Sequence, residues 1–173
     1  MRGYFIDATR TILKGEGLRA VSVRNVAQIA GYSYATMYNY FKDVKELIFE
    51  CVCGFMDECR EFVEKQTAEQ DPGLRRIRAV SIAYMKYFVE YPGIFELFYI
   101  ENHTSHSPSH NSDELINNFL ETLCEEDWNK LVADGMISLD KKEELVRQLK
   151  YLTVGMMIFY LHKREKMEYL EFF

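Results

Sequence analysis

The densest group of hydrogen-bonding side chains in the sequence is the segment SYATMYNYF, residues 33–41. Its uncharged donors and acceptors are Tyr34, Thr36, Tyr38, Asn39 and Tyr40. Hydroxyl and amide groups of this kind bind phosphate oxygens and the edges of nucleic-acid bases. Met37 and Phe41 lie four residues apart, so we expect both to face a core while the polar side chains point outward. Taken alone, the segment is equally typical of a surface helix in an ordinary bundle.

The residues before this segment predict two further helices. Apolar side chains between residues 5 and 13 follow helical spacing, and Gly15 and Gly17 are good C-terminal breakers. Ser22 can cap a second short helix, whose apolar positions lie between residues 23 and 30. Both helices are short enough to pack against segment 33–41 as one small domain.

A turn joins the second helix to the polar segment. Gly31 allows the positive φ that a tight turn needs, and Ser33 is a natural cap for a third helix through Phe41. Two short helices joined in this way form a helix-turn-helix, whose second helix lies in the major groove of DNA. The spacing therefore predicts that the third helix faces base edges and phosphates.

The charge of the chain is unevenly distributed. The whole sequence carries a net charge of −6, which taken alone argues against nucleic-acid binding. Residues 1–47 contain seven basic and four acidic side chains, a net of +3. The other 126 residues contain 14 basic and 23 acidic side chains, a net of −9. The basic N-terminal region would be attracted to DNA phosphates, whereas the acidic remainder of the chain would be repelled by them. This distribution of charge favours the DNA-binding hypothesis.

The remainder of the sequence also predicts helices. Asp43, with Glu46 three residues later, is typical of a capping box that opens a fourth helix. Further helices are predicted over residues 74–91, 93–101 (opened by Pro92), 113–134 and 140–166, with a polar loop over residues 102–112. No stretch alternates with period two, so the fold class is all-α. We expect a DNA-binding domain over residues 1–47 and a helical domain over residues 48–173.

Composition excludes several classes of protein. The chain of 173 residues is 48% hydrophobic and 28% charged, which is typical of a soluble globular protein. No apolar run approaches the roughly 18 residues of a membrane-spanning helix, and the N-terminus lacks a secretion signal. The 4 cysteines are unevenly spread, which favours reduced thiols in a cytoplasmic protein over a disulfide framework.

Metal binding and catalysis are the alternatives that the sequence supports least. Cys51 and Cys53 lie two residues apart and would point away from each other on a helix. His103, His106 and His110 lie in the predicted loop with no cysteine nearby. There is no glycine-rich phosphate loop, nucleophile elbow or catalytic histidine signature. We therefore expect no metal, no cofactor and no enzymatic activity.

The run VSVRNVAQIAGYSYATMYNYFKDVKEL, residues 21–47, resembles the DNA-binding signature of the TetR family of bacterial transcriptional regulators. The shared features are a hydroxyl residue that opens the second helix, an Ala-Gly pair at the turn, and a Tyr-Phe pair before a charged segment ending in leucine. Here these are Ser22, Ala30-Gly31, Tyr40-Phe41 and Leu47. The resemblance spans about residues 5–47 and is highly specific, whereas beyond it only general features agree.

The resemblance implies a role for each matching residue. Tyr38 and Tyr40 would donate their hydroxyls to phosphates, and Thr36 would contact the backbone or a base. Tyr34 and Asn39 would be exposed to the groove. The DNA-binding candidates are Ser22, Arg24, Ser33, Tyr34, Ala35, Thr36, Tyr38, Asn39, Tyr40, Lys42 and Lys45.

Two positions depart from the family pattern. Val44 stands where relatives usually carry lysine, with Lys45 one residue later. Tyr34 stands where Lys, Arg or Pro is frequent. The operator sequence therefore does not transfer from any relative.

The resemblance also implies that the second half of the chain binds an effector and dimerises. Large apolar side chains are dense there and could line a pocket between helices, although plain core packing is the alternative for each one. The candidate pocket residues are Tyr84, Met85, Phe88, Phe95, Phe98, Tyr99, Phe119 and Met156. Such a pocket favours an apolar or aromatic ligand, and the acidic excess favours a cationic one.

Gly155 beside two methionines indicates a close helix crossing, as in a homodimer through residues 113–134 and 140–166. The sequence thus predicts a homodimeric regulator that binds double-stranded operator DNA, a repressor released by a small apolar or aromatic effector. The alternative is a DNA-binding helical protein without an effector.

Overall fold

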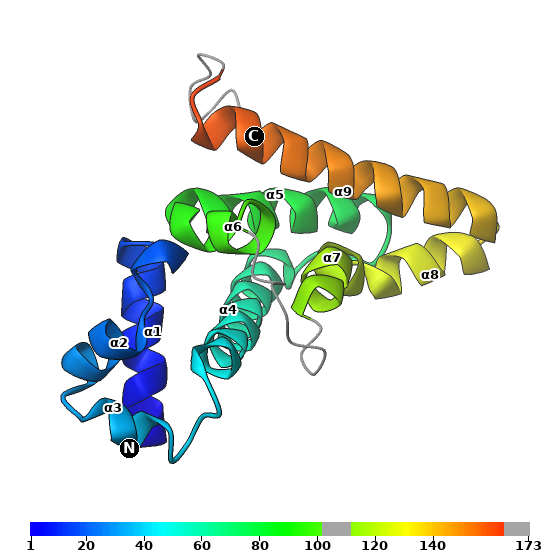
Figure 1. The fold of residues 1–173 in the computed structure, drawn as a ribbon. Helices are drawn as coiled ribbons and strands as arrows, with labels where there is room; N and C mark the ends of the chain where they lie inside the picture. The colour runs from blue at the N-terminus through cyan, green and yellow to red at the C-terminus, as the bar shows by residue number, and fades with distance from the viewer. Residues whose placement is uncertain (102–111, 165–173) are drawn as a thin grey trace. The chain divides into compact units, whose positions relative to one another are not determined.

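The computed structural model describes residues 1–101 and 112–164. Within these ranges every regular element is a helix, which confirms the all-α class (Figure 1). In chain order the elements are α1 (Arg2–Gly15), the short 3-10 helix η1 (Leu18–Ala20), α2 (Val23–Ala30), α3 (Tyr34–Met37), α4 (Val44–Thr67), α5 (Leu74–Glu90), α6 (Pro92–Tyr99), α7 (Ser112–Leu123), α8 (Glu125–Ala133) and α9 (Leu139–Leu161). Apart from Ser112, the predicted polar loop lies outside the described residues, as does the predicted helix end at residue 166.

The chain divides into two compact units. The first unit comprises residues 1–58 and 91–116, and the second comprises residues 59–90 and 117–173. The division falls inside α4 and α7, so the first half of α4 and all of α6 belong with the N-terminal helices. The units therefore divide elsewhere than after residue 47, and the functional boundary expected there stays a prediction.

One apolar cluster holds α1, α2 and α3 together in the first unit. Its fully or nearly fully buried members are Phe5, Ala8, Ile12, Val26, Met37, Phe41 and Leu47. Met37 and Phe41 both face this core, as their four-residue spacing predicts. The other side chains of α3 and of the turn after it therefore lie at or near the surface.

Helix α6 approaches the C-terminal end of α1 very closely in the first unit. A Cβ atom at Gly93 would lie 2.9 Å from the carbonyl oxygen of Leu13 and 3.3 Å from that of Lys14. Pro92 occupies the start of α6, where its missing N–H is harmless, as the sequence predicts. Glycine is required at residue 93 because any side chain would push α6 away from α1.

Helix α3 is shorter than the predicted helix through Phe41 and ends at Met37. Beyond it, the N–H of Asn39 donates to the carbonyl of Thr36 at 3.2 Å, and that of Tyr40 donates to Met37 at 3.0 Å. These i to i−3 bonds are tighter than α-helical ones, so the chain continues as turns that carry Phe41 into the core.

The single helix predicted over residues 113–134 is wrong, because α7 and α8 are separate helices with a break at Cys124. The buried positions keep helical spacing across the break, which is why periodicity alone predicted one helix. The missed signal is the run Glu125, Glu126 and Asp127, which forms the first turn of α8. Acidic side chains are stabilised at a helix N-terminus by its partial positive charge.

The second unit is held together by aromatic packing and a buried ion pair. The ring of Tyr84 lies 4.8 Å from that of Phe88 and 5.9 Å from that of Phe119, centroid to centroid. Asp127 is completely buried and accepts hydrogen bonds from the Gly73 N–H at 2.8 Å and from Arg76 at 2.7 Å. This carboxylate ties the turn before α5 to α8.

Candidate nucleic-acid interface

The helix-turn-helix is fixed by two serine caps and one glycine. The Ser22 hydroxyl accepts from the Asn25 N–H at 3.2 Å, and the Ser33 hydroxyl accepts from the Thr36 N–H at 3.1 Å. Gly31 ends α2 with φ 75° and ψ 23°, a left-handed conformation that favours glycine. Both caps and the turn were predicted from the sequence, and the structure confirms them. The direction of α3 relative to α2 is therefore set by local interactions.

Three tyrosines around α3 are exposed although large aromatic side chains are usually buried. The exposed fractions are 66% for Tyr34, 51% for Tyr38 and 38% for Tyr40. Asn39 is also exposed, and the Thr36 hydroxyl lies 2.9 Å from that of Ser33. An uncharged surface of hydroxyls and amides on a rigid support is the kind that contacts phosphates and base edges.

Tyr32 supports this surface from behind. Its ring centroid lies 5.7 Å from those of both Tyr4 and Phe5. Tyr40 in turn has its ring 6.4 Å from Phe5. The aromatic side chains of the turn are thus anchored on α1, which limits the motion of the exposed hydroxyls.

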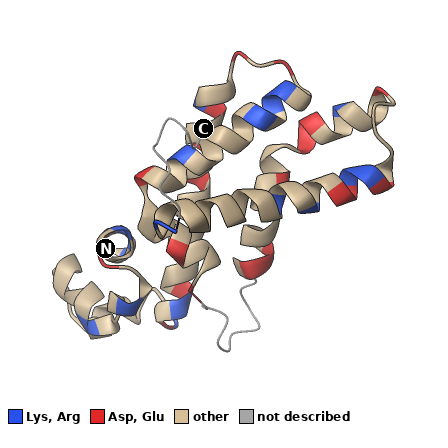
Figure 2. Ribbon diagram, turned by 90° about the horizontal axis from the view of Figure 1, so that it is seen from above, with Lys and Arg blue, Asp and Glu red and all other residues tan. Residues whose placement is uncertain are grey.

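Basic side chains flank the polar surface. Arg24 on α2 and Lys42 after α3 are exposed, and Figure 2 shows the Lys and Arg positions of these helices in blue. The N–H of Lys42 donates to the Glu46 carboxylate at 2.6 Å, while Glu46 donates its own N–H to Asp43 at 2.9 Å. The predicted cap of α4 is therefore formed, although the glutamate reaches one residue further back than in a regular capping box.

Ion pairs tie α1 to the first half of α4 within the first unit. Arg10 and Lys14 both pair with Glu58, and both cations also lie over the Phe55 ring. Arg2 pairs with Glu50 at 2.8 Å. A movement of this part of α4 would therefore be transmitted to α1 and its partner helices.

A large apolar cavity lies in the second unit among α5, α8 and α9. Its volume is about 830 Å³, and its apolar lining includes Ile77, Met85, Trp128, Leu149, Leu152 and Met156. A cavity of this size and lining suits a small organic ligand.

The predicted pocket residues divide into three groups. Met85 and Met156 line this cavity. Tyr84, Phe88 and Phe119 do not line it but pack on one another as core, the plain alternative for such residues. The α6 residues Phe95, Phe98 and Tyr99 belong to the first unit, where the Phe95 and Tyr99 rings lie 5.2 Å apart.

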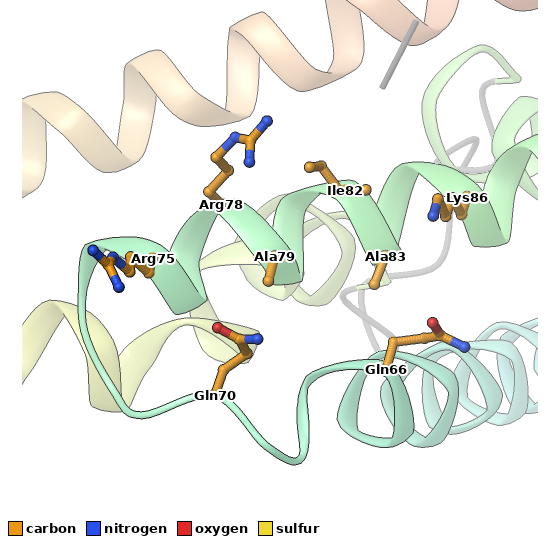
Figure 3. A pocket seen from close by; sticks show the side chains of 8 residues that line it. All are labelled: Gln66, Gln70, Arg75, Arg78, Ala79, Ile82, Ala83 and Lys86. Carbon is orange, nitrogen blue, oxygen red and sulfur yellow. The ribbon is translucent and has the colours of Figure 1, made fainter. Parts of the chain in front are cut away.

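A second, polar pocket of about 460 Å³ lies between the end of α4 and α5. Figure 3 shows its lining, in which the polar members are Gln66, Gln70, Arg75, Arg78 and Lys86. None of these residues was selected from the sequence. The available signal was the run RRIR, a basic cluster in an otherwise acidic body.

The lining of these two cavities gives no support to the expectation of a cationic ligand, which stays a prediction. Neither set of lining residues includes an Asp or Glu. The acidic excess of this part of the chain is therefore not directed at either cavity.

The cysteines are thiols in environments that suppress their reactivity. Burial raises the pKa of Cys51 and of Cys124 to about 12, and it also raises the pKa of Cys59. Within residues 1–101 and 112–164, no group of three or more His, Cys, Asp or Glu side chains is placed to hold a metal ion. The histidines proposed as the alternative ligands lie outside these ranges.

None of the helices in the described part of the chain combines the length and the apolar character needed to cross a membrane.

The fold and the site define a helix-turn-helix DNA-binding protein. Residues 5–51 match the profile of bacterial regulatory proteins of the tetR family. A 57-residue segment is 32% identical to the HTH-type transcriptional repressor KstR2 of Rhodococcus jostii (strain RHA1), covering 33% of this chain and 28% of that relative. The resemblance found in the sequence is confirmed for the N-terminal segment, which is similar to the DNA-binding domain of tetR family regulators, and the matched segment spans less than a third of that relative's length.

Solved structures extend the similarity of fold to nearly the whole chain. The TetR family regulator PfmR of Thermus thermophilus has a TM-score of 0.67 at 20% identity, with 92% of this chain and 86% of that chain covered. The transcriptional regulator FadR of Bacillus subtilis, in complex with stearoyl-CoA, has a TM-score of 0.70 at 16% identity, with 95% and 90% covered.

Proposed function

We propose that this protein is a homodimeric transcriptional repressor that binds operator DNA through α3 and the turn after it. The observation that carries the proposal is the exposed set of Tyr34, Tyr38 and Tyr40 on a capped helix-turn-helix. Tyr38 and Tyr40 donate to phosphates, while Tyr34 and Asn39 reach base edges in the major groove. The candidates Ser22, Arg24, Ser33, Ala35, Thr36, Lys42 and Lys45 complete this surface.

Dimerisation uses α9 together with α7 and α8. One side of α9 carries apolar side chains that are exposed in the single chain: Tyr151 at 65%, Leu152 at 60% and Phe159 at 48%. Gly155 lies among them, and a Cβ added there would meet nothing within 4 Å. This open glycine suits a close crossing with a second copy. To engage successive major grooves, the two DNA-binding heads of the dimer must lie about 34–36 Å apart.

A charge at Gly155 tests the dimer. Replacement of a mid-helix glycine by glutamate improves helix propensity and has room in the single chain, so Gly155→Glu should fold as a monomer. Sedimentation should show this loss of the dimer, and operator affinity should fall with it. A monomeric wild-type protein at micromolar concentration would contradict the proposal.

The effector half of the proposal rests on the apolar cavity among α5, α8 and α9. The structurally similar FadR was solved in complex with stearoyl-CoA, whose acyl chain is apolar, and this supports an effector with an apolar part. A ligand that binds better to the arrangement with the heads splayed shifts the population away from DNA.

Selection of DNA sequences from a random pool tests the function as a whole. The wild-type protein should enrich a two-fold symmetric sequence, because a symmetric dimer binds two equivalent half-sites. Enrichment of no sequence, with salt-dependent binding to every duplex alike, would favour a non-specific DNA-binding protein instead.

A further inference from the structure

We propose that the ligand of the second unit is an amphipathic anion, an apolar chain or ring system that bears a carboxylate or phosphate. Its apolar part occupies the cavity among α5, α8 and α9, and its anionic group binds Arg75 and Arg78. This inference rests on the proposed function, since it names the class of effector that the regulator binds.

The two arginines lie on the boundary between the apolar cavity and the polar pocket. Arg75, Arg78 and Ile82 follow one face of α5 at spacings of three and four residues, and each of them lines both cavities. Figure 3 shows the guanidinium of Arg78 rising from α5 toward α9, while Gln66 and Gln70 extend toward α5 from the opposite side. A molecule that bridges this boundary would have an apolar end in one cavity and a polar end in the other.

The two arginines on this boundary are exposed to solvent and have no protein partner in the described part of the chain. Arg75 and Arg78 form no hydrogen bond or ion pair with any described residue, whereas the neighbouring Arg76 is paired with Asp127 at 2.7 Å. The lining of both cavities lacks acidic side chains. Guanidinium groups bind carboxylates and phosphates through two parallel hydrogen bonds, so these arginines select an anion.

A buried donor inside the apolar cavity also lacks a partner. Trp128 lines the cavity and is only 4% exposed, and its indole N–H makes no hydrogen bond within the described part of the chain. An unsatisfied buried donor is unfavourable. The indole nitrogen has almost no accessible surface, so a ligand oxygen could accept from it only after the ring shifts, and the selection of an anion rests on the two arginines.

Trp128 also supplies the measurement, because it is the chain's single tryptophan and it lines the cavity. Its fluorescence should be titrated with dodecanoate, dodecyl phosphate, dodecanol and dodecyltrimethylammonium, each below its micelle concentration. We expect both anions to bind about tenfold or more tightly than dodecanol, and the cation to bind most weakly.

The double variant Arg75→Gln and Arg78→Gln tests the role of the guanidiniums. It should weaken binding of the anions by about ten- to a hundredfold and leave dodecanol unchanged, which also shows that the variant is folded. The matched control is Lys65→Gln, which removes a single positive charge from an exposed position on α4 that lines neither cavity. The control should bind all four probes as the wild type does.

Lauroyl-coenzyme A tests whether the polar pocket accepts a headgroup larger than a carboxylate. A preference for it over dodecanoate, lost in Gln66→Ala and Gln70→Ala, would support a phosphorylated headgroup in the polar pocket. A preference for dodecanoate that the glutamine variants keep would support a free carboxylate at the arginines.

Three outcomes would overturn the inference. Equal affinity for dodecanol and for the anions would show that the cavity binds apolar molecules but that the arginines do not select an anionic group. The fluorescence of Trp128 could also change with protein concentration in the absence of any ligand. If it does so in the wild type but not in the Gly155→Glu variant, a second copy of the chain covers the cavity. Failure of every probe would also end the effector half of the proposed function, while the DNA selection would still decide the other half.

Discussion

The hydroxyl of Tyr38 offers the sharpest test of the proposed DNA contact. Tyr38 is 51% exposed and its hydroxyl makes no hydrogen bond with any described residue, so Tyr38→Phe removes nothing on which the fold depends. We expect the free energy of unfolding to change by no more than about 0.5 kcal/mol. Any loss of DNA affinity would then result from the lost contact between Tyr38 and DNA and not from unfolding of the protein.

The expected loss is set by two symmetric contacts. One phosphate hydrogen bond contributes about 0.5–1.5 kcal/mol net, and a dimer would lose two of them. The affinity should therefore fall by about 1–3 kcal/mol, or about five- to 150-fold. Because the contact is to the phosphate backbone, the same factor should apply to a random duplex and to the selected operator.

Fluorescence anisotropy with both duplexes, at several salt concentrations, measures this effect. Tyr38→Phe should leave the salt dependence of binding unchanged because it removes no charge, whereas Arg24→Gln should reduce it. Tyr4→Phe is the matched control, an exposed tyrosine on α1 outside both the proposed DNA-contacting set and the proposed dimer interface, and it should bind DNA as the wild type does. If Tyr38→Phe binds both duplexes with wild-type affinity, Tyr38 does not contact a phosphate and the proposed docking of α3 is wrong.

Three further predictions concern the support of the two sites. Gly93→Ala places a Cβ 2.9 Å from a backbone oxygen of α1, so overpacking should destabilise the protein by about 1–3 kcal/mol in urea unfolding and weaken DNA binding. Asp127→Asn breaks an ion pair whose carboxylate is fully buried and whose guanidinium is partly exposed, which should lower the unfolding free energy by about 1–3 kcal/mol. In the folded protein, half-buried Cys53 should be alkylated first, because burial raises the pKa of Cys51 to about 12 and leaves it almost wholly protonated at neutral pH.

Each of these predictions has a matched comparison. Gly3→Ala adds a methyl group to α1 where nothing lies within 4 Å and should be neutral or stabilising. Lys130→Gln breaks an exposed ion pair with Asp134 and should cost less than about 1 kcal/mol. Mass spectrometry of the alkylated protein identifies the cysteine that reacts, and early modification of Cys51 in folded protein would contradict the burial of its thiol.

The DNA-binding half could be predicted from the sequence because its signals are local. Ser22, Gly31 and Ser33 each determine a cap or a turn within three residues of themselves, and all three behave in the structure as predicted. The exact end of α3 could not be predicted, because it depends on how far the chain must travel to bury Phe41 against α1. This distance depends on how the helices pack in the core and cannot be derived from residues 34–41 alone.

The position of the apolar cavity could not be predicted from the sequence, because periodicity does not reveal vacant volume. Helical spacing correctly placed Tyr84, Phe88 and Phe119 toward the interior, but their rings fill the space among one another. The cavity forms instead where α5 faces the aliphatic residues of α9, Leu149 and Leu152 among them, which lie more than sixty residues further along the chain. Only the packing of three helices distant in sequence decides which apolar side chains border unfilled space.

The net charge of a region is also a weak guide to the charge of its ligand. A sum over residues 48–173 gives −9, yet the charge that a ligand meets depends on the few side chains that line its site. For the proposed site these side chains include Arg75 and Arg78, which belong to the basic run RRIR. An acidic exterior would disfavour the approach of an anion, so the two arginines have to provide the whole attraction at short range. Salt screens this long-range repulsion more than it screens a direct contact, so raising the salt concentration should strengthen the binding of dodecanoate relative to that of dodecanol.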